Sequence, residues 1–305
     1  MQRSLVGSEM CIRDRPKIFL FENVKGMLSM RETFYKKDKD GNIVYEIKKN
    51  KETGSERKYP VVERHGRKII DIIKEQFADI TDDLGYNISC EVLNTVDYGV
   101  PENRERVFVV GIRKDLDIEW NYPTAIQGDK LTIKDAILDL PIVEEGENIT
   151  TYSIQPQNDY QKLMRGENKV LTEHYCGVYG DKIRTVIKNV KQGEGKEDFN
   201  KLVESGVIDK KYRLTSGYKN TYGRLIENIP APTITNNMTA PSGLRCIHYS
   251  QNRALTPREG ARIQSFPDWF EFRGGVGSVT TQIGNAVPPL MAIILAKQIE
   301  KLLKG

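Results

Sequence analysis

Glu22 stands where a charged side chain can meet a ligand. It directly follows the apolar run 18–21 (IFLF), which predicts a strand buried on both faces of a parallel sheet. Open α/β sheets bind ligands at the carboxyl ends of their strands, so Glu22 is a candidate binding or catalytic residue. Taken alone, a glutamate at a strand end is more often part of a structural salt bridge.

A second candidate pair, Arg104 and Arg106, ends the turn-rich segment 97–106 (DYGVPENRER). This segment predicts a hairpin between strands at 88–93 and 107–112. A guanidinium presents a rigid, planar fork of donors, which holds an oxygen atom of a ligand better than lysine does. An exposed, charged hairpin turn would explain the two arginines equally well.

Asn285 and Ala286 lie just before a predicted helix at 288–303. Free N–H groups at a helix amino terminus attract polar ligands, although a simple turn before a terminal helix is compatible with the same residues. Another helix is predicted to start at Thr256, which can cap it, with Pro257 in the first turn and Glu259 completing a capping box.

The composition excludes several function classes. Cys11, Cys90, Cys176 and Cys246 are far apart with no CxxC spacing, so we expect reduced thiols, no disulfide framework and no metal site. No apolar run approaches the ~20 residues that span a bilayer, and no secretory signal is present, which favours a cytoplasmic protein. A net charge of +4 permits a polyanionic partner without requiring one.

Several elements must position these side chains. Apolar residues at helical spacing predict a helix over 69–80, with Gly85 as its stop, and the polar stretch 31–67 reads as an exposed insertion. Strand, helix, strand and hairpin in this order predict an α/β sheet with one antiparallel edge. Segment 115–250 predicts a smaller, irregular second domain, and the final helix shows a broad apolar face that includes Leu290 and Ile293.

Four stretches of the chain, in this order, resemble motifs of the DNA cytosine-5 methyltransferases. They are 21–26 (FENVKG), 98–107 (YGVPENRERV), 253–267 (RALTPREGARIQSFP) and 282–289 (QIGNAVPP). The resemblance implies a partial Rossmann-like sheet of an S-adenosylmethionine-dependent methyltransferase, with a smaller target-recognition domain. It also implies double-stranded DNA as substrate and S-adenosyl-L-methionine as cofactor, in a bacterial restriction–modification system.

The same resemblance assigns roles to individual residues. Glu22, with Asn23 and Val24 beside it, would bind the N3 and amine edge of a flipped cytosine, and Arg106 would hold the cytosine O2. Arg104 would support a catalytic thiolate and nearby backbone. Asn285 and Ala286 would line the cofactor pocket, whereas the segment 253–267 would be structural. Glu102 stands where the family most often has glutamine, a change expected to be tolerated.

In this interpretation the chain has four segments. Residues 1–15 resemble adapter-derived sequence, and 16–114 form the C-terminal half of the catalytic domain. Residues 115–250 form the recognition domain, and 251–305 return to complete the catalytic domain. A natural disordered terminus is the alternative for the first segment. The family's glycine-rich cofactor turn and its Pro-Cys nucleophile loop find no match. We therefore expect a fragment that is inactive alone; the alternatives are one subunit of a split methyltransferase, or a DNA-binding module without chemistry.

Overall fold

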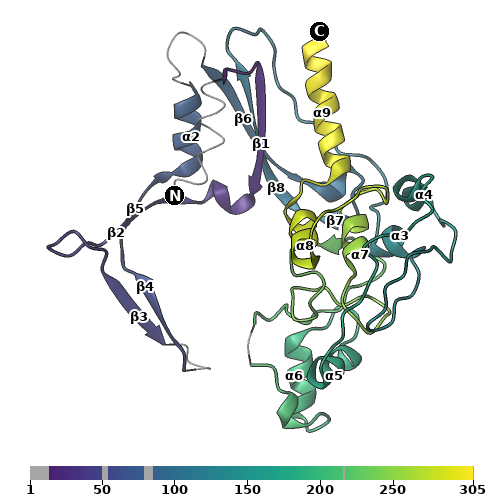
Figure 1. The fold of residues 1–305 in the computed structure, drawn as a ribbon. Coiled ribbons are helices and arrows are strands. Elements are labelled where there is room, and N and C mark those ends of the chain that lie inside the picture. Colours follow the sequence, from purple (N-terminus) through teal and green to yellow (C-terminus); the bar gives the residue numbers. More distant parts are fainter. Residues whose placement is uncertain (1–13, 50–53, 79–84, 216, 305) are drawn as a thin grey trace. The chain divides into compact units, whose positions relative to one another are not determined.

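The computed structural model describes residues 14–49, 54–78, 85–215 and 217–304. The chain forms two compact units (Figure 1). The first comprises 1–93, 105–123 and 296–305, and the second comprises 94–104 and 124–295. Most of the predicted segment 1–15, including Cys11, lies outside the described residues, as does the predicted end of the first helix at Ile80.

A three-stranded sheet forms the centre of the first unit. Its strand order is β1 (Ile18–Val24), β8 (Glu105–Arg113) and β6 (Tyr86–Asn94), and β1 runs antiparallel to β8. Residues 107–112 of β8 are buried, as expected for a central strand. In contrast, β1 buries only Phe19 fully, so the prediction of a strand buried on both faces of a parallel sheet is wrong. The reason is its position in this order, with β8 as its one partner among the described strands.

Helix α2 (Ile69–Ala78) covers one side of this sheet through aromatic packing. The ring of Phe19 lies 4.5 Å from that of Phe77 and 5.0 Å from that of Tyr86, measured between centroids. Gly111, the register partner of Phe19, has no room for a side chain, because a Cβ would lie 2.2 Å from the Phe19 ring. The predicted start of this helix at residue 69 is confirmed.

The predicted exposed insertion is a β-ribbon made of two antiparallel strand pairs, of which the inner pair is a hairpin. Strand β2 (Arg31–Tyr35) pairs with β5 (Val62–Lys68), and β3 (Tyr45–Lys49) pairs with β4 (Glu56–Pro60). Figure 1 shows the β2–β5 pair continuing into the β3–β4 pair. Nearly every residue of these strands is exposed, which confirms the expected exposure.

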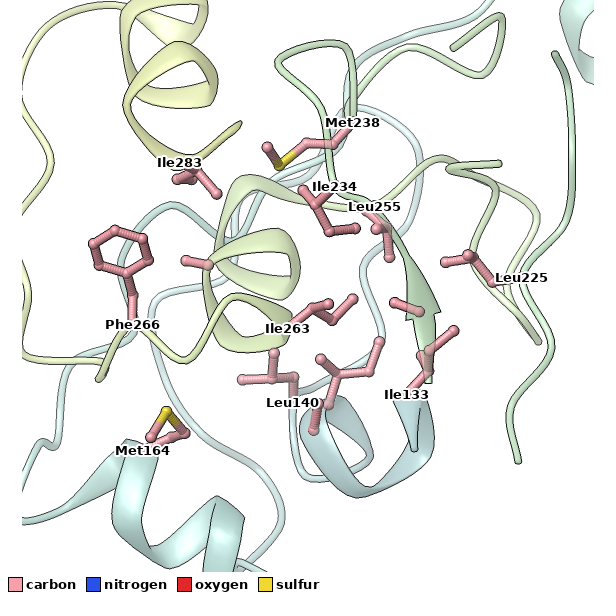
Figure 2. Close-up of a cluster of buried hydrophobic side chains, with 14 of the residues drawn as sticks. Ile133, Leu140, Met164, Leu225, Ile234, Met238, Leu255, Ile263, Phe266 and Ile283 are labelled. Atoms are coloured by element: carbon pink, nitrogen blue, oxygen red, sulfur yellow. The ribbon is translucent and has the colours of Figure 1, made fainter. Parts of the chain in front are cut away.

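The second unit is organised around helix α7 (Pro257–Ile263), all of whose residues are buried. Side chains from distant parts of the sequence, among them Leu140, Leu225 and Ile283, gather with Ile263 in one apolar cluster (Figure 2). Three short helices contribute to this cluster: α3 (Ile133–Ile137), α4 (Asp159–Arg165) and α8 (Val276–Asn285). Helices α5 (Asp181–Asn189) and α6 (Lys196–Glu204) form a separate apolar cluster that includes Val186 and Phe199. The remaining short elements are η2 (Lys25–Leu28), η3 (Thr95–Tyr98), η4 (Lys210–Tyr212), β7 (Glu102–Asn103) and β9 (Ala231–Pro232).

The start of α7 confirms the predicted capping box. Thr256 Oγ1 accepts a hydrogen bond from the Glu259 N–H, the Glu259 carboxylate accepts one from the Thr256 N–H, and Pro257 is the first helical residue. Glu259 also binds Arg253 through two hydrogen bonds of 2.6 and 2.7 Å, with both side chains almost fully buried. These internal partners agree with the expected structural role of segment 253–267.

The boundaries of the two compact units differ from those of the four predicted segments. Residues 94–104 belong with the second unit, and 251–295 stay in that unit instead of forming one return segment with 296–305. Helix α9 (Pro289–Lys304) therefore begins in one unit and ends in the other. Met291 and Leu295 are its buried residues, whereas Ile293, expected on the apolar face, is 48% exposed.

Candidate functional site

Glu22 and Arg106 meet at one end of the β1–β8 pair. In the antiparallel register Glu22 lies opposite Phe108 and Arg106 lies opposite Val24, so the two residues are diagonal neighbours on one face. Arg106 Nε lies 2.8 Å from Glu22 Oε1, and both side chains keep some exposure, 15% and 18%. This carboxylate–guanidinium pair is partly accessible, so a polar ligand can reach both groups.

Asn23 and Val24, the expected substrate-binding neighbours of Glu22, are both exposed. The Asn23 side-chain oxygen accepts a hydrogen bond of 2.8 Å from the N–H of Val24, which fixes the chain as it leaves β1. Directly beyond, Lys25 pairs with Glu105 at 3.0 Å. The exit of β1 and the entrance of β8 thus carry alternating charges at the end of the sheet that holds Glu22.

Arg104 has a different environment, buried within the second unit. Its guanidinium donates to the carbonyl oxygens of Ile234, Gly284 and Ala286 at 3.0–3.2 Å, and its side chain is 2% exposed. Three segments far apart in sequence are therefore joined by one side chain. This geometry agrees with the backbone-supporting half of the role expected for Arg104; its support of a thiolate stays a prediction.

Glu102 is a residue whose importance the sequence did not reveal. It is fully buried, accepts a 2.6 Å hydrogen bond from the N–H of Ile234, and lies 3.6 Å from Arg104 Nη1. A glutamine could accept the same bond but would not supply the negative charge beside Arg104. Glu102 lies in β7 and Arg104 lies between β7 and β8. Their two-residue spacing beside a predicted strand is the signal that could have paired them, because residues i and i+2 of a strand share one face.

The segment 284–286 ends helix α8 in close contact with the chain at 235–236. A Cβ on Gly284 would lie 2.5 Å from the backbone N of Asn236, so this position accepts no side chain. Asn285 is exposed and its side chain makes no hydrogen bond to the described residues, whereas Ala286 is half-buried. Arg104 therefore fixes the backbone around an asparagine whose amide is available to a ligand.

The structure brings together some of the predicted site residues. Glu22 and Arg106 meet in the first unit, with Asn23 and Val24 beside them, while Arg104, Asn285 and Ala286 belong to the second unit. Arg104 and Ala286 are in direct contact. The convergence of all these residues on one cleft stays a prediction.

The described cysteines lack the environment of a nucleophile. Burial raises the pKa of the Cys90 thiol in β6 and of the Cys176 thiol, and it raises the pKa of Cys246 to about 12. A thiolate is the reactive form, so each of these groups is poorly suited to nucleophilic attack. Along the described part of the chain, no three His, Cys, Asp or Glu side chains are grouped so that they could hold a metal ion.

Within the described ranges, no single helix is long and apolar enough to cross a bilayer. Helices α8 and α9 reach the required length and hydropathy only when taken together, with a bend of 44° between them.

Comparison with known proteins identifies relatives over most of the chain. The chain is 30% identical over 304 residues to the type II methyltransferase M.DdeI of Desulfomicrobium norvegicum, covering 93% of this chain and 63% of that protein. It is 34% identical to M1.HphI of Haemophilus parahaemolyticus, covering 75% of this chain and 51% of that protein. The chain therefore spans between half and two-thirds of the length of these relatives.

A solved structure supports the fold. The crystal structure of a protein described as a DNA modification methyltransferase, encoded within an E. coli prophage, matches 97% of this chain with a TM-score of 0.65 at 22% identity. The profile of the C-5 cytosine-specific DNA methylases matches residues 61–301. This match covers most of the sequence, and the chain belongs to the C-5 cytosine-specific DNA methylase family.

Proposed function

We propose that this protein carries out part of the transfer of a methyl group from S-adenosylmethionine to C5 of a cytosine in duplex DNA. The observation that carries the proposal is the Glu22–Arg106 pair, because it offers a carboxylate and a guanidinium together at an accessible sheet end. Cytosine presents a complementary edge, in which the N3 and amine groups can bind a carboxylate and the O2 can accept from a guanidinium.

In the proposed reaction the target cytosine leaves the base stack and exchanges partners with the ion pair. Glu22 binds the amine and N3, and a proton held between Glu22 and N3 offsets the charge that develops when a thiolate adds to C6. Arg106 donates to O2, which fixes the ring. C5 would then take the methyl group from the cofactor, which would leave as S-adenosylhomocysteine. Loss of the C5 proton to water would release the thiolate and regenerate the protein.

The residues of the second unit fit a cofactor-supporting role. The exposed amide of Asn285, on a backbone held by Arg104, would hold S-adenosylmethionine, with Ala286 beside it. When bound, this cofactor supplies the electrophilic methyl group. The segment 115–250 would contact DNA, and the two type II methyltransferases among the relatives favour a restriction–modification system.

Burial disfavours the thiolate forms of Cys90, Cys176 and Cys246, so we propose that another thiol supplies the nucleophile. A complementing polypeptide that contributes the Pro-Cys loop and the glycine-rich cofactor turn would complete the site.

The decisive experiment uses a chimera in which this chain replaces the region of M.DdeI that it matches. Transfer of labelled methyl groups to duplex DNA is measured for the chimera and for its Glu22→Gln variant. We expect activity in the chimera and a loss of about 100-fold or more in the variant, which is isosteric but lacks the acid–base function. An active, folded Glu22→Gln chimera would remove Glu22 from the reaction. DNA binding by the chimera without any methyl transfer would favour a binding module instead.

A further inference from the structure

The positive charge of this protein is concentrated in the β-ribbon 31–68. This segment has twelve Lys and Arg against seven Asp and Glu, a net charge of +5, whereas the whole chain has +4. The rest of the sequence is therefore slightly acidic. The four family motifs, 21–26, 98–107, 253–267 and 282–289, all lie outside this ribbon, so they do not account for the concentration of charge.

The ribbon carries cations on both of its faces, and aromatic rings hold two of them in place. In the β3–β4 hairpin the register places Lys49 and Lys58 on one face and Lys48 and Arg57 on the other. The ammonium of Lys58 lies 4.6 Å from the centroid of the Tyr45 ring, which holds the lysine against the hairpin. Arg64 is held in the same way, with its guanidinium carbon 4.1 Å from the Phe34 ring centroid.

Several of these cations lack acidic partners. Lys48 and Lys49 pair with Glu46 and Glu56. In the described part of the ribbon, Arg57, Lys58 and Arg64 are exposed and have no carboxylate within salt-bridge distance. A two-stranded hairpin in water gains little stability from its own packing, and unpaired cations on both faces do not add to it. These cations are therefore better explained by binding to a polyanion than by a role in stabilising the fold.

The base of the ribbon is tied to the segment that follows Glu22. The Ile69 N–H donates to the Met30 carbonyl at 2.9 Å, and Arg31 Nη1 donates to the Gly66 carbonyl at 3.1 Å. Strand β5 leads directly into α2, which packs on the sheet that holds Glu22 and Arg106. The ribbon is therefore attached near Glu22 in sequence and belongs to the same unit as the candidate site.

We propose that the ribbon 31–68 is a separate duplex-DNA contact, which binds the phosphate backbone without reading sequence. The major groove of B-DNA admits a two-stranded β-ribbon, and cations on both faces can then reach phosphates on both walls. The inference rests on the proposed function in taking duplex DNA as the polyanion. It assigns that contact to a segment outside the expected recognition region 115–250.

The test measures binding of the 305-residue chain to a fluorescent duplex of random sequence across a series of salt concentrations. The test variant carries Arg57→Gln and Lys58→Gln. The matched control carries Lys297→Gln and Lys301→Gln, which removes the same charge from exposed positions of α9 in the same unit. We expect the ribbon variant to lose affinity about 10-fold at low salt, and the slope of log K against log salt to fall by about 1 to 2. The control should stay close to the parent.

A second variant removes residues 45–60 and joins Val44 to Val61 through Asn-Gly. The Val61 N–H already donates to the Val44 carbonyl at 2.8 Å, so a tight turn can close this gap. It should lose as much affinity as the double substitution or more, while the helical circular dichroism signal of the chain stays the same, because the deletion removes only strands β3 and β4 and the residues that connect them.

Equal loss in the ribbon variant and the α9 control would overturn the proposal, because general charge would then explain binding. No binding by the folded parent at low salt would overturn it too. Selective loss of binding to a structured RNA, with duplex DNA unaffected, would assign the ribbon to another partner. None of these results decides the proposed function, which depends on methyl transfer by the chimera.

Discussion

The Glu22 carboxylate lies 2.8 Å from the Nε of Arg106, although the two residues are two register positions apart on β1 and β8. Their diagonal placement on one face of an antiparallel pair explains why residues 84 positions apart in sequence are in contact. The two side chains bind each other in this structure, so the ion pair orients both of them. Under the proposed function, a base that binds both residues would have to compete with this pair.

Replacing Arg106 with lysine should impair the reaction more than the fold. Lysine keeps the charge but loses the planar fork that can donate to Glu22 and to a base oxygen simultaneously. In the M.DdeI chimera we expect methyl transfer to fall by about 100-fold. The free energy of unfolding should change by no more than about 1 kcal/mol, because the pair is partly exposed. Parallel activity assays and urea unfolding check both values; undiminished activity would contradict the role of Arg106.

Replacing Arg104 with methionine should strongly reduce the stability of the fold, in contrast to the replacement of Arg106. The substitution leaves the carbonyl groups of Ile234, Gly284 and Ala286 without their donor and removes the cation beside the buried Glu102. Removing one partner of a buried ion pair costs roughly 3–5 kcal/mol. Urea unfolding of the 305-residue chain measures the loss. The double variant with Glu102→Gln should recover part of the lost stability. If Arg104→Met lowers the free energy of unfolding by less than about 1 kcal/mol, the contacts of Arg104 do not stabilise the second unit.

Gly284 and Gly277 of α8 provide a matched pair for testing close packing. Alanine at 284 would place a Cβ 2.5 Å from the backbone N of Asn236, whereas alanine at 277 has no atom within 4 Å. We expect Gly284→Ala to destabilise the chain by at least about 2 kcal/mol, since backbone atoms cannot easily move away. Gly277→Ala should be neutral or stabilising by up to about 1 kcal/mol. Equal effects in thermal unfolding would show that the segment at 235–236 does not press on α8.

Features that depend on neighbouring residues in the sequence were predicted better than features that depend on distant ones. The capping box at Thr256 and the start of α2 follow from residues within one helical turn, and both are confirmed. The antiparallel pairing of β1 was missed, because an apolar run has the same appearance in either sheet type. The contacts of Arg104 with residues 130 to 182 positions away carry no periodic signal at all. The motifs identified Arg104 and Arg106 together, but only tertiary packing separates their environments.

His248 should make the stability of the second unit depend on pH. Its Nδ1 accepts hydrogen bonds from the N–H groups of Ser250 and Gln251, which requires an unprotonated nitrogen. Burial lowers its pKa from 6.5 to about 4, although Glu259 opposes this shift. The unfolded chain therefore binds a proton more readily between these two values. The resulting stability is complete above pH 6.5 and is lost as the pH falls towards 4, by roughly 3 kcal/mol.

Urea unfolding between pH 7.5 and about pH 4.5 measures this dependence. The pKa of Glu259 is lowered from 4.5 to about 2, because the charges of Arg253 and His248 outweigh the effect of burial. Glu259 should therefore affect the pH dependence of stability only below about pH 4.5. The His248→Gln variant should be less stable at neutral pH but should show a flatter profile. A wild-type profile that stays flat from pH 7 to 4.5 would mean that His248 takes up its proton as readily in the folded state as in the unfolded chain. His174, whose pKa burial also lowers, adds to the same slope.

The 305-residue chain by itself should not methylate DNA. Addition at C6 needs a thiolate beside the base, and Cys246 has a pKa of about 12 while burial also disfavours the thiolates of Cys90 and Cys176. Cys90 is in the same unit as Glu22, but it packs among the apolar residues beneath α2. An assay with labelled S-adenosylmethionine should give no transfer for the chain alone, and full transfer for the M.DdeI chimera. Transfer by the chain alone would contradict this account of its thiols. Serine variants of Cys90 and Cys11 would then show which thiol reacts.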